Sequence, residues 1–458
     1  MEVRSIRSVE YTQYPPSLQA LFRALSPPRP PHPATRPSPM QMMTGDWLQG
    51  PYVYALYVMY GFDRGQIGLL FIAGFGSSFL FGTVAGSLAD RVGRKRMALV
   101  YCVTYAVGCL TKHSSDFYVL LFGRILAGIA TSLLFSVFEA WVVGEHHRQN
   151  FDDSLLGDLF SRSTFWGNGV AAIVSGLVAS FLVEFLSLGK VAPFDAAAVV
   201  LSLGFFLISS TWTENYGQSD SSVPITQMFA SAWNAITSST QVAALGVCQA
   251  VFEGAMYVFI FLWTPAIETP TDGNFVAAYV PHGLIFACFM AASMLGSGLS
   301  THLMRQNDPS KYMMYVFLGA AVCLCAPTLT LVLGWTYPTL GRPGTGFLVD
   351  LGGVSLAGQL NLLAFVCYEL LVGIFWPSMM KLRAKHVPDE VRATVINIFR
   401  MPVNLFVCLV LFKSGVLSVQ VMFILCAAMN VVAAVALRWV AASSGPEYQR
   451  GNMSETDI

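Results

Sequence analysis

The stretch "GSLADRVGRKRM", from Gly86 to Met97, brings one acid and four bases into a segment whose flanks are almost free of charge. The flanking runs are apolar, as in helices that cross a lipid bilayer. Gly93 lies among the charges, and glycine permits the tight turn that joins two such helices. Bases concentrate in the cytosolic loops of membrane proteins. The stretch is therefore expected to be a short cytosolic loop between two membrane spans.

The composition indicates an integral membrane protein. Of 458 residues, 55% are hydrophobic and 11% are charged, against about 25% charged in soluble domains. Mean hydropathy is +0.58. Because lipid offers a backbone amide no partner, each apolar run is expected to be helical, which gives an all-α fold. The formal net charge is zero, so we expect the lipid bilayer, and no nucleic acid, as a partner.

Twelve apolar runs are candidate transmembrane helices. They cover residues 41–60, 67–89, 97–111, 117–143, 164–187, 191–213, 241–266, 276–303, 312–334, 357–380, 392–413 and 418–441. A polar segment divides them six and six, which predicts two halves, 40–213 and 241–441, joined by a cytosolic linker at 214–240. Residues 1–39, with nine of the 23 prolines, are expected to be a disordered cytosolic tail, and residues 442–458 a second cytosolic tail.

The distribution of lysine and arginine predicts the orientation. With the opening stretch in the cytosol, eleven of these bases lie in cytosolic loops: Arg91, Arg94, Lys95, Arg96, Arg148, Arg305, Lys311, Lys381, Arg383, Lys385 and Arg392. Five lie in outer loops: Arg64, Lys112, Lys190, Arg342 and Lys413. This excess of bases in the cytosolic loops predicts that the N-terminus and the C-terminus both lie in the cytosol. The plasma membrane is the expected location.

Two sequence echoes relate the halves. The segment "GSGLSTHLMRQNDPSKYM" follows the eighth span, as the opening stretch follows the second, with His302 where Asp90 would stand. Arg124 in "GRILAG" and Glu369 in "YELLVG" each lie four residues before a glycine. Parallel repeats of this kind are typical of the two halves of a facilitator-type transporter.

The opening stretch resembles the signature of the major facilitator superfamily between its second and third helices. The fixed positions of that signature are filled by Gly86, Asp90, Arg91, Gly93, Arg94 and Lys95. The resemblance implies that these residues form a gating motif. It also implies that Asp90 faces the start of a helix in the other half, where a carboxylate meets the positive end of a helix dipole.

Other segments resemble the molybdate-anion transporter family, a branch of that superfamily. They are "DWLQGPYVYALY", "LLFSVFEAWVVGEH", "VAPF", "WTENYG", "FLWTP" and "FMAASMLGS", in family order between about residues 46 and 440. The resemblance implies uptake of the tetrahedral oxyanion molybdate. The apolar run before "DWLQGPY" is shorter than in the family, which indicates a shortened first helix.

Arginines inside the spans are the candidate substrate-binding residues. An intramembrane charge is expensive, so it usually faces a cavity or a partner. Arginine also presents a planar fork of donors that suits an oxyanion. We select Arg124 in the fourth span and Arg400 in the eleventh, with neutral donors Asn168, Asn397 and Asn404.

Acids inside the spans are candidates for coupling transport to a proton. They are Asp46, Glu139, Glu253 and Glu369. Arg124 and Glu139 are fifteen residues apart, about 22 Å along a helix, so they cannot pair with each other. Glu253 shares a helix face with Gln249 and Tyr257. The resemblance to the major facilitator superfamily implies that this face lines the central cavity.

Enzyme activity is not expected, because no nucleophile with its base and no paired carboxylates occupy a plausible aqueous cleft. Neither a nucleotide-binding loop nor a metal-ligand spacing is present, so no cofactor and no metal are expected. Three alternatives to molybdate transport stay open. The chain could carry another small anion such as sulfate, it could carry a neutral solute, or it could be a membrane sensor or scaffold that does not transport.

Overall fold

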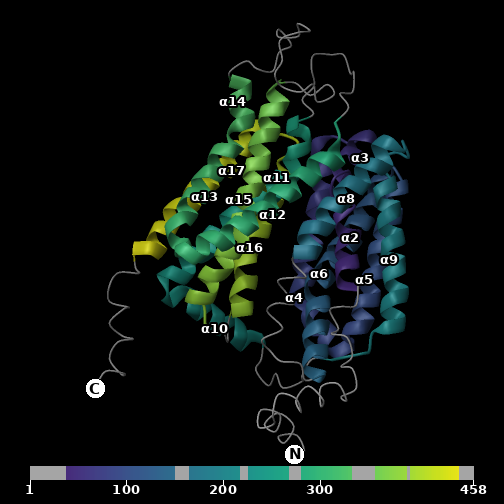
Figure 1. The fold of residues 1–458 in the computed structure, drawn as a ribbon, viewed down its shortest axis with the longest axis horizontal. Coiled ribbons are helices and arrows are strands. Elements are labelled where there is room, and N and C mark those ends of the chain that lie inside the picture. Colours follow the sequence, from purple (N-terminus) through teal and green to yellow (C-terminus); the bar gives the residue numbers. More distant parts are fainter. Residues whose placement is uncertain are drawn as a thin grey trace, which may run out of the picture.

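The computed structural model describes residues 38–149, 165–216, 225–267, 280–332, 356–388 and 392–442. Within these ranges every regular element is a helix, which confirms the all-α prediction (Figure 1). The two predicted tails lie almost entirely outside the described residues. The helices form two bundles, one from each half of the sequence.

The N-terminal bundle contains the first group of helices. They are α2 (Ser38–Trp47), α3 (Val53–Met59), α4 (Arg64–Val92), α5 (Arg94–Leu110), η3 (Thr111–His113), α6 (Phe117–Arg148), η4 (Phe165–Val170), α8 (Ala171–Ser180), η5 (Phe181–Phe185) and α9 (Ala192–Thr211). Two of these, η4 and η5, are π-helical turns on either side of α8. Single π-turns inside helices often lie at functional sites.

The C-terminal bundle contains the second group. They are α11 (Thr240–Ile267), α12 (His282–Gln306), α13 (Pro309–Leu324), α14 (Ala326–Val332), α15 (Leu356–His386), α16 (Arg392–Phe412) and α17 (Val419–Ala442). Before them, α10 (Ile225–Ser238) lies within the predicted linker, in the segment "ITQMFASAWNAITS". Its buried Ala232 packs with Val242 and Phe399, so this part of the linker is a helix attached to the C-terminal bundle.

Ten helical segments of the described chain are long and apolar enough to cross a membrane. The twelve predicted spans exceed this number for a physical reason. The predicted third span is α5, which has only 17 residues. The predicted first span is two short helices, α2 and α3, separated around Gly50 and Pro51, where proline supplies no N–H to continue the helix. The remaining spans agree with the ten segments.

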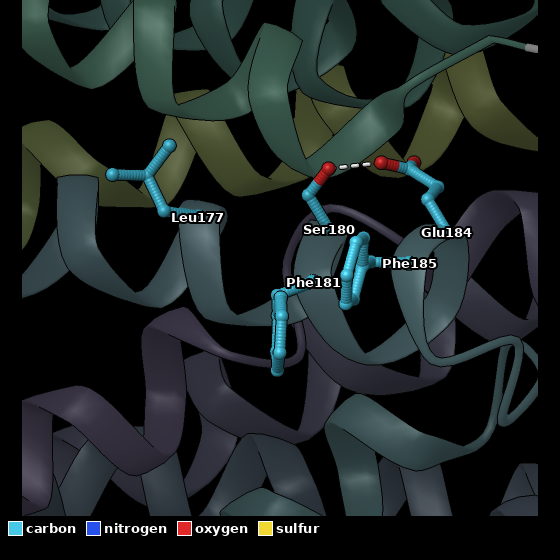
Figure 2. A pocket seen from close by; sticks show the side chains of 5 residues that line it. All are labelled: Leu177, Ser180, Phe181, Glu184 and Phe185. Carbon is cyan, nitrogen blue, oxygen red and sulfur yellow. Dashed lines mark hydrogen bonds between the residues drawn. The ribbon is translucent and has the colours of Figure 1, made fainter.

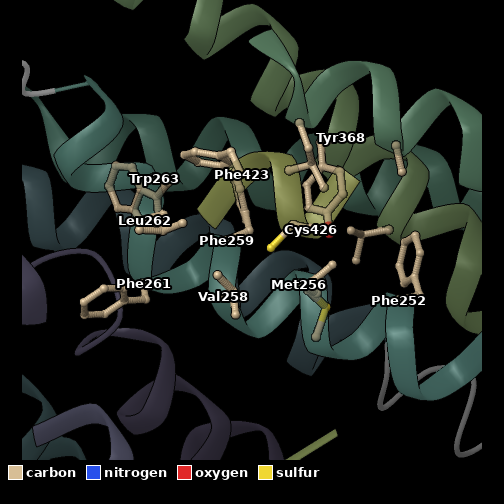
Figure 3. Close-up of a cluster of buried hydrophobic side chains, with 14 of the residues drawn as sticks. Phe252, Met256, Val258, Phe259, Phe261, Leu262, Trp263, Tyr368, Phe423 and Cys426 are labelled. Carbon is tan, nitrogen blue, oxygen red and sulfur yellow. The ribbon is translucent and has the colours of Figure 1, made fainter. Parts of the chain in front are cut away.

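Each bundle has its own buried hydrophobic core. In the N-terminal bundle, Trp141 and Trp212 stack with ring centroids 3.7 Å apart, beside Phe138. In the C-terminal bundle, Phe252 stacks on Phe375 at 4.0 Å. Figure 3 shows part of this core, with Phe252, Phe259 and Tyr368 among its members. The second core also includes residues of α3 and α4, so the bundles share apolar packing at one end.

The predicted echo between the halves corresponds to the same helix contact in both bundles. A side chain at Gly128 on α6 would meet the carbonyl oxygen of Gly74 on α4. A side chain at Gly373 on α15 would meet the carbonyl oxygen of Ser293 on α12. Small residues allow such close helix approach in membranes. The two glycines therefore join the fourth helix of each half to its second.

The bundles are hydrogen-bonded to each other at one end only, among the residues described here. Arg64 Nε and Nη2 donate to the carbonyl oxygens of Ser414 and Leu417, each at 2.5 Å. The Gly283 N–H donates to Tyr52 Oη at 3.3 Å. We call this the Arg64 end, and the opposite end of α4 the Asp90 end. The conformation is closed at the Arg64 end.

Candidate functional site

The charged opening stretch forms the turn between α4 and α5. Gly93 has a φ angle of +114°, which residues with a side chain rarely adopt. A Cβ atom at Gly93 would lie 2.6 Å from the carboxyl carbon of Glu214. Glycine is therefore required at this turn. Gly86, by contrast, has no atom within 4 Å of its Cβ position, so packing does not require glycine there.

Arg94 ties this turn to two helices. Its Nη2 lies 2.7 Å from Asp90 Oδ1 on α4, and its Nη1 donates to the carbonyl oxygen of Ala140 on α6 at 2.8 Å. Lys95 Nζ donates to the carbonyl oxygen of Ser209 on α9 at 2.8 Å, whereas Arg91 is exposed. Among the described residues, Asp90 has Arg94 as its partner. The contact with the other half that the resemblance implies is not made by these residues in this conformation.

Glu214 lies in the segment predicted to be a cytosolic linker, but in the structure its side chain caps the start of α5. Its Oε1 accepts from the N–H of Lys95 at 2.8 Å, and its Oε2 accepts from the N–H of Arg96 at 3.3 Å. The first N–H groups of a helix lack partners within the helix and carry the positive end of its dipole. The segment after α9 therefore completes the charged turn.

The equivalent turn of the C-terminal half uses a different acid. Asp308 caps α13 by accepting from the N–H of Ser310 at 3.0 Å, and Lys385 Nζ at the end of α15 lies 2.6 Å from Asp308 Oδ2. Partial burial raises the pKa of Asp308, but the hydrogen bonds from Lys385 and Ser310 outweigh it and hold the pKa at about 2. The degenerate copy thus keeps an acid–base pair without a counterpart of Asp90.

Arg124 lies half-buried on α6 and faces α4. Its Nε donates to the carbonyl oxygen of Leu70 at 3.3 Å, and its guanidinium carbon lies 4.9 Å from the centroid of the Phe71 ring. Its charge also acts on the carboxylate of Asp46 on α2, which accepts a hydrogen bond from Tyr105. The structure therefore brings two predicted residues, Arg124 and Asp46, into electrostatic contact, although they do not form a direct ion pair.

Two other candidates of the N-terminal bundle have no assigned polar contact in the described chain. Glu139 is exposed on α6. It lies on the same side of α6 as Arg124. Arg124, Thr131, Phe135 and Glu139 follow one another at intervals of seven, four and four residues, which places them on one helix face. Asn168 is half-buried in the π-helical turn η4.

Glu253 is the centre of a polar cluster in the C-terminal bundle. Its side chain is 1% exposed, and the charges that act on it are those of Arg400 on α16 and Arg383 on α15. Gln249, one turn away on α11, accepts a hydrogen bond from Arg383 Nη1 at 2.8 Å. Tyr257 lies one turn to the other side and interacts electrostatically with Glu253 and Arg400. The predicted face of Glu253 thus interacts electrostatically with the predicted Arg400.

The predicted polar stripe on α16 is only partly described. Arg400 is exposed, and Asn404 Nδ2 donates to the carbonyl oxygen of Arg400 at 2.9 Å. That bond uses one of the two N–H groups of the Asn404 amide within its own helix. The side chain of Asn397 lies outside the described residues. Glu369 is buried on α15, where its side chain is 6% exposed.

An aromatic layer separates the two charged clusters. Phe71, over which Arg124 lies, is 6.2 Å from Phe75 between ring centroids, and Phe75 is 5.2 Å from Tyr257. Phe71 also packs edge-on against Phe261 at 5.3 Å. Arg124 and Glu253 therefore approach the boundary between the bundles from opposite sides of these rings.

Two residues that sequence reasoning did not select contribute to polar contacts. Arg383 was counted as a loop base, yet it is 8% exposed and bonded to Gln249. Glu184 lies in η5, where it accepts hydrogen bonds from Ser180 and, at 2.5 Å, from Tyr52 Oη. Glu184 and Ser180 line a surface pocket of about 290 Å³ together with Leu177, Phe181 and Phe185. Figure 2 shows the Ser180 hydroxyl pointing toward the Glu184 carboxylate. The sequence signal that could have identified Glu184 is an acidic residue inside the apolar span predicted at 164–187.

A family model and individual relatives found by sequence comparison are all described as transporters. Residues 38–365 match a family model described as sugar transporters with 12 transmembrane segments. A molybdate-anion transporter of Xenopus laevis is 35% identical over 390 residues, which cover 84% of this chain and 80% of the relative. One of Danio rerio is 34% identical over 386 residues, covering 80% of this chain and 75% of the relative.

Solved structures of other transporters have the same fold as this chain. A point mutant of the nucleoside transporter NupG superposes with a TM-score of 0.69, at 14% identity, over 89% of this chain and 99% of that one. A D-xylose-proton symporter superposes with a TM-score of 0.64, at 12% identity, over 88% of this chain and 95% of that one. At these identities the likeness concerns the fold alone.

Proposed function

Because this chain belongs to the molybdate-anion transporter family of the major facilitator superfamily, we propose that it carries molybdate across a membrane by alternating access. Membership makes the chain a multi-pass secondary transporter and not an enzyme. The units that move are the two halves, residues 40–213 and 241–441. We place the protein in the plasma membrane with both termini in the cytosol, so that the Asp90 end is cytosolic and transport is uptake.

The observation that carries this proposal is the approach of arginines to the boundary between the bundles from both sides. Arg124 lies over Phe71 on one side, and Arg400 acts on Glu253 on the other. Two guanidinium groups present forks of donors that match the oxygens of a tetrahedral oxyanion. We assign the anion to these two arginines, with Asn168, Asn397 and Asn404 as neutral donors.

We further propose that a proton accompanies the anion. Glu253 is buried beside Arg400, and Glu139 lies on the same side of α6 as Arg124. Asp46 and Glu369 are secondary candidates for this coupling. A buried carboxylate that gains and loses a proton can change the charge of the site during the cycle. Uptake that does not change with pH, in wild type and in Glu253→Gln and Glu139→Gln variants, would contradict coupling at these residues.

The charged turn is proposed to control the conformational cycle. Gly93 fixes the turn, and Arg94 joins Asp90 to α6. Gly86, Arg91 and Lys95 complete this gating motif. We expect Asp90→Asn to lower the rate of uptake while the preference for molybdate over sulfate stays as in wild type. A changed preference in that variant would assign Asp90 to the substrate site instead.

Uptake of labelled molybdate at nanomolar concentration, in cells that express this chain, tests the proposal. We expect uptake above that of control cells, reduced in Arg124→Ala and resistant to equimolar sulfate. Equal inhibition by sulfate would indicate a general oxyanion transporter. Inhibition by a sugar instead would favour the neutral solute suggested by the family description. Absence of uptake with the protein at the cell surface would favour a sensor or scaffold.

A further inference from the structure

The surface pocket around Glu184 is a groove along one face of α8 and η5. Its lining residues are Leu177, Ser180, Phe181, Glu184 and Phe185, which run along these two elements (Figure 2). We call it the Glu184 groove. Leu177, Phe181 and Phe185 are exposed. On a helix that spans a membrane, exposed apolar side chains contact the lipid chains. Glu184 is the one charged residue that lines this apolar groove.

The groove extends from the hydrocarbon core to the headgroup region of a bilayer. The segment from Phe165 to Phe185 is long and apolar enough to cross a membrane, and Glu184 is its last residue but one. Lipid headgroups begin where the hydrocarbon core ends. The carboxylate therefore lies at the depth of the headgroups, and Leu177, about 10 Å further along the helix, lies at the depth of the acyl chains.

The hydrogen bonds of Glu184 are those of an ionised carboxylate. Its Oε2 accepts from the Ser180 hydroxyl, and its Oε1 accepts from Tyr52 Oη at 2.5 Å. The oxygen of Tyr52 itself accepts from the Gly283 N–H at 3.3 Å, so the hydroxyl hydrogen of Tyr52 is directed to Glu184. A protonated carboxyl group would donate from one of its oxygens, whereas an ionised one only accepts.

No base neutralises this carboxylate among the residues that the structure describes. The ion pairs within 4 Å in that part of the chain involve other acids, namely Asp90, Glu145, Asp195, Glu214 and Asp308. Lys190, the next base along the chain, donates to the carbonyl oxygen of Ala55 at 3.4 Å. An ionised group at the edge of the hydrocarbon core is costly unless it is paired. The complement of the groove is therefore a cation attached to an apolar chain.

We propose that the Glu184 groove binds a membrane phospholipid with a primary ammonium headgroup, such as phosphatidylethanolamine. The ammonium donates a charge-assisted hydrogen bond to the Glu184 carboxylate, and an acyl chain lies over Phe181 and Leu177. A choline headgroup has the same charge but no N–H to donate, so it binds less tightly. This site is separate from the proposed anion site, and the inference does not depend on which solute the chain carries.

Photo-crosslinking of the full-length protein in lipid nanodiscs tests this inference. The nanodiscs consist of phosphatidylcholine with a small fraction of a probe phospholipid that carries a diazirine in one acyl chain. Three probes differ only in the headgroup, which is ethanolamine, choline or glycerol. Mass spectrometry of the peptides measures the labelling of residues 177–185. We expect the ethanolamine probe to label this segment about fivefold more than the choline probe, as an ion pair near the surface allows, and the glycerol probe to label it least.

Two variants separate the charge of the groove from other acids at the same end of the bundle. In Glu184→Gln the amide oxygen can still accept from Tyr52, but the negative charge is absent. The ethanolamine and choline probes should then label residues 177–185 equally. Asp195→Asn is the matched control, because it removes a carboxylate outside the groove, where Asp195 lies 2.7 Å from His113. This variant should keep the preference of the wild type.

The inference is overturned if the ethanolamine and choline probes label residues 177–185 equally in wild type, which would mean that the groove holds bulk lipid only. It is also overturned if the preference for ethanolamine persists in Glu184→Gln. If that variant does not fold, the comparison of the three probes in wild type still decides the matter. A failure of molybdate uptake would change none of these results, so the two proposals fail separately.

Discussion

Arg64 and Ser414 exchange hydrogen bonds across the two bundles. Arg64 Nε donates to the carbonyl oxygen of Ser414 at 2.5 Å, and the Ser414 hydroxyl donates to the carbonyl oxygen of Arg64 at 3.1 Å. The bonds join the start of α4 to the turn after α16. In alternating access a closed end must also open, so these bonds have to break in each cycle.

Replacing Arg64 should therefore favour opening of the Arg64 end. Arg64→Ala removes the donors to Ser414 and Leu417, and we expect the distance between the bundles at this end to increase. Spin labels at Met59→Cys and Val416→Cys, both at exposed positions, report that distance by double electron–electron resonance. The labelling uses a background without the exposed cysteines Cys288 and Cys367.

Arg64→Lys is the conservative comparison, because lysine keeps the charge but has no planar fork to reach two carbonyl oxygens. We expect a distance distribution between those of wild type and Arg64→Ala. If wild type and Arg64→Ala give the same distribution, the hydrogen bonds of Arg64 do not hold this end closed.

Close packing at Gly283 should be necessary for closure of the same end. A Cβ atom at Gly283 on α12 would lie 2.8 Å from Ser180 Cβ on α8, so Gly283→Val cannot keep this approach. Overpacking of this kind costs about 1–3 kcal/mol. We expect uptake to be largely lost, with the protein still folded by size-exclusion chromatography. Gly298→Ala on the same helix has open space, and uptake of that variant should match wild type.

The ion pair of Asp308 and Lys385 should stabilise the Asp90 end in a pH-dependent manner. The pKa of Asp308 is lowered from 3.8 to about 2. A lowered pKa in the folded state stabilises the protein above the unfolded pKa, and this contribution is lost as pH falls from about 4 towards 2. Asp308→Asn keeps a residue that can cap α13 but removes the charge.

Thermal unfolding in detergent measures this effect. At pH 6 the Tm of Asp308→Asn should lie below that of wild type, by an amount that corresponds to at most about 1 kcal/mol for a partly exposed pair. The difference should shrink as the pH approaches 3. A difference that is constant over this range would mean that the charge of Asp308 does not contribute.

The motifs that depend on local geometry could be predicted from the sequence. Gly93 forms the turn with positive φ, and the glycines four residues after Arg124 and Glu369 make equivalent contacts in both bundles. Such features could be predicted because turn geometry and helix spacing are properties of neighbouring residues. The break around Gly50 and Pro51 was missed, because residues 41–60 were predicted as one continuous span.

Contacts between distant residues could not be predicted. Arg383 and Gln249 are 134 positions apart, and Tyr52 and Glu184 are 132 apart. Arg383 looked like a loop base because its neighbours are charged, but α15 continues to His386 and buries it. The electrostatic interaction of Arg124 with Asp46 also depends on how α2 rotates against α6, which sequence periodicity does not fix.

The central claim is that arginines on both sides of the boundary between the bundles bind a transported oxyanion. Uptake of labelled molybdate into proteoliposomes that contain only this protein tests it most directly, with Arg124→Gln, Arg400→Gln and the exposed control Arg438→Gln. The account predicts saturable uptake by wild type and Arg438→Gln, and a loss of roughly tenfold or more for each of the other variants. Uptake no greater than in protein-free liposomes, or wild-type rates in both Arg124→Gln and Arg400→Gln, would contradict it.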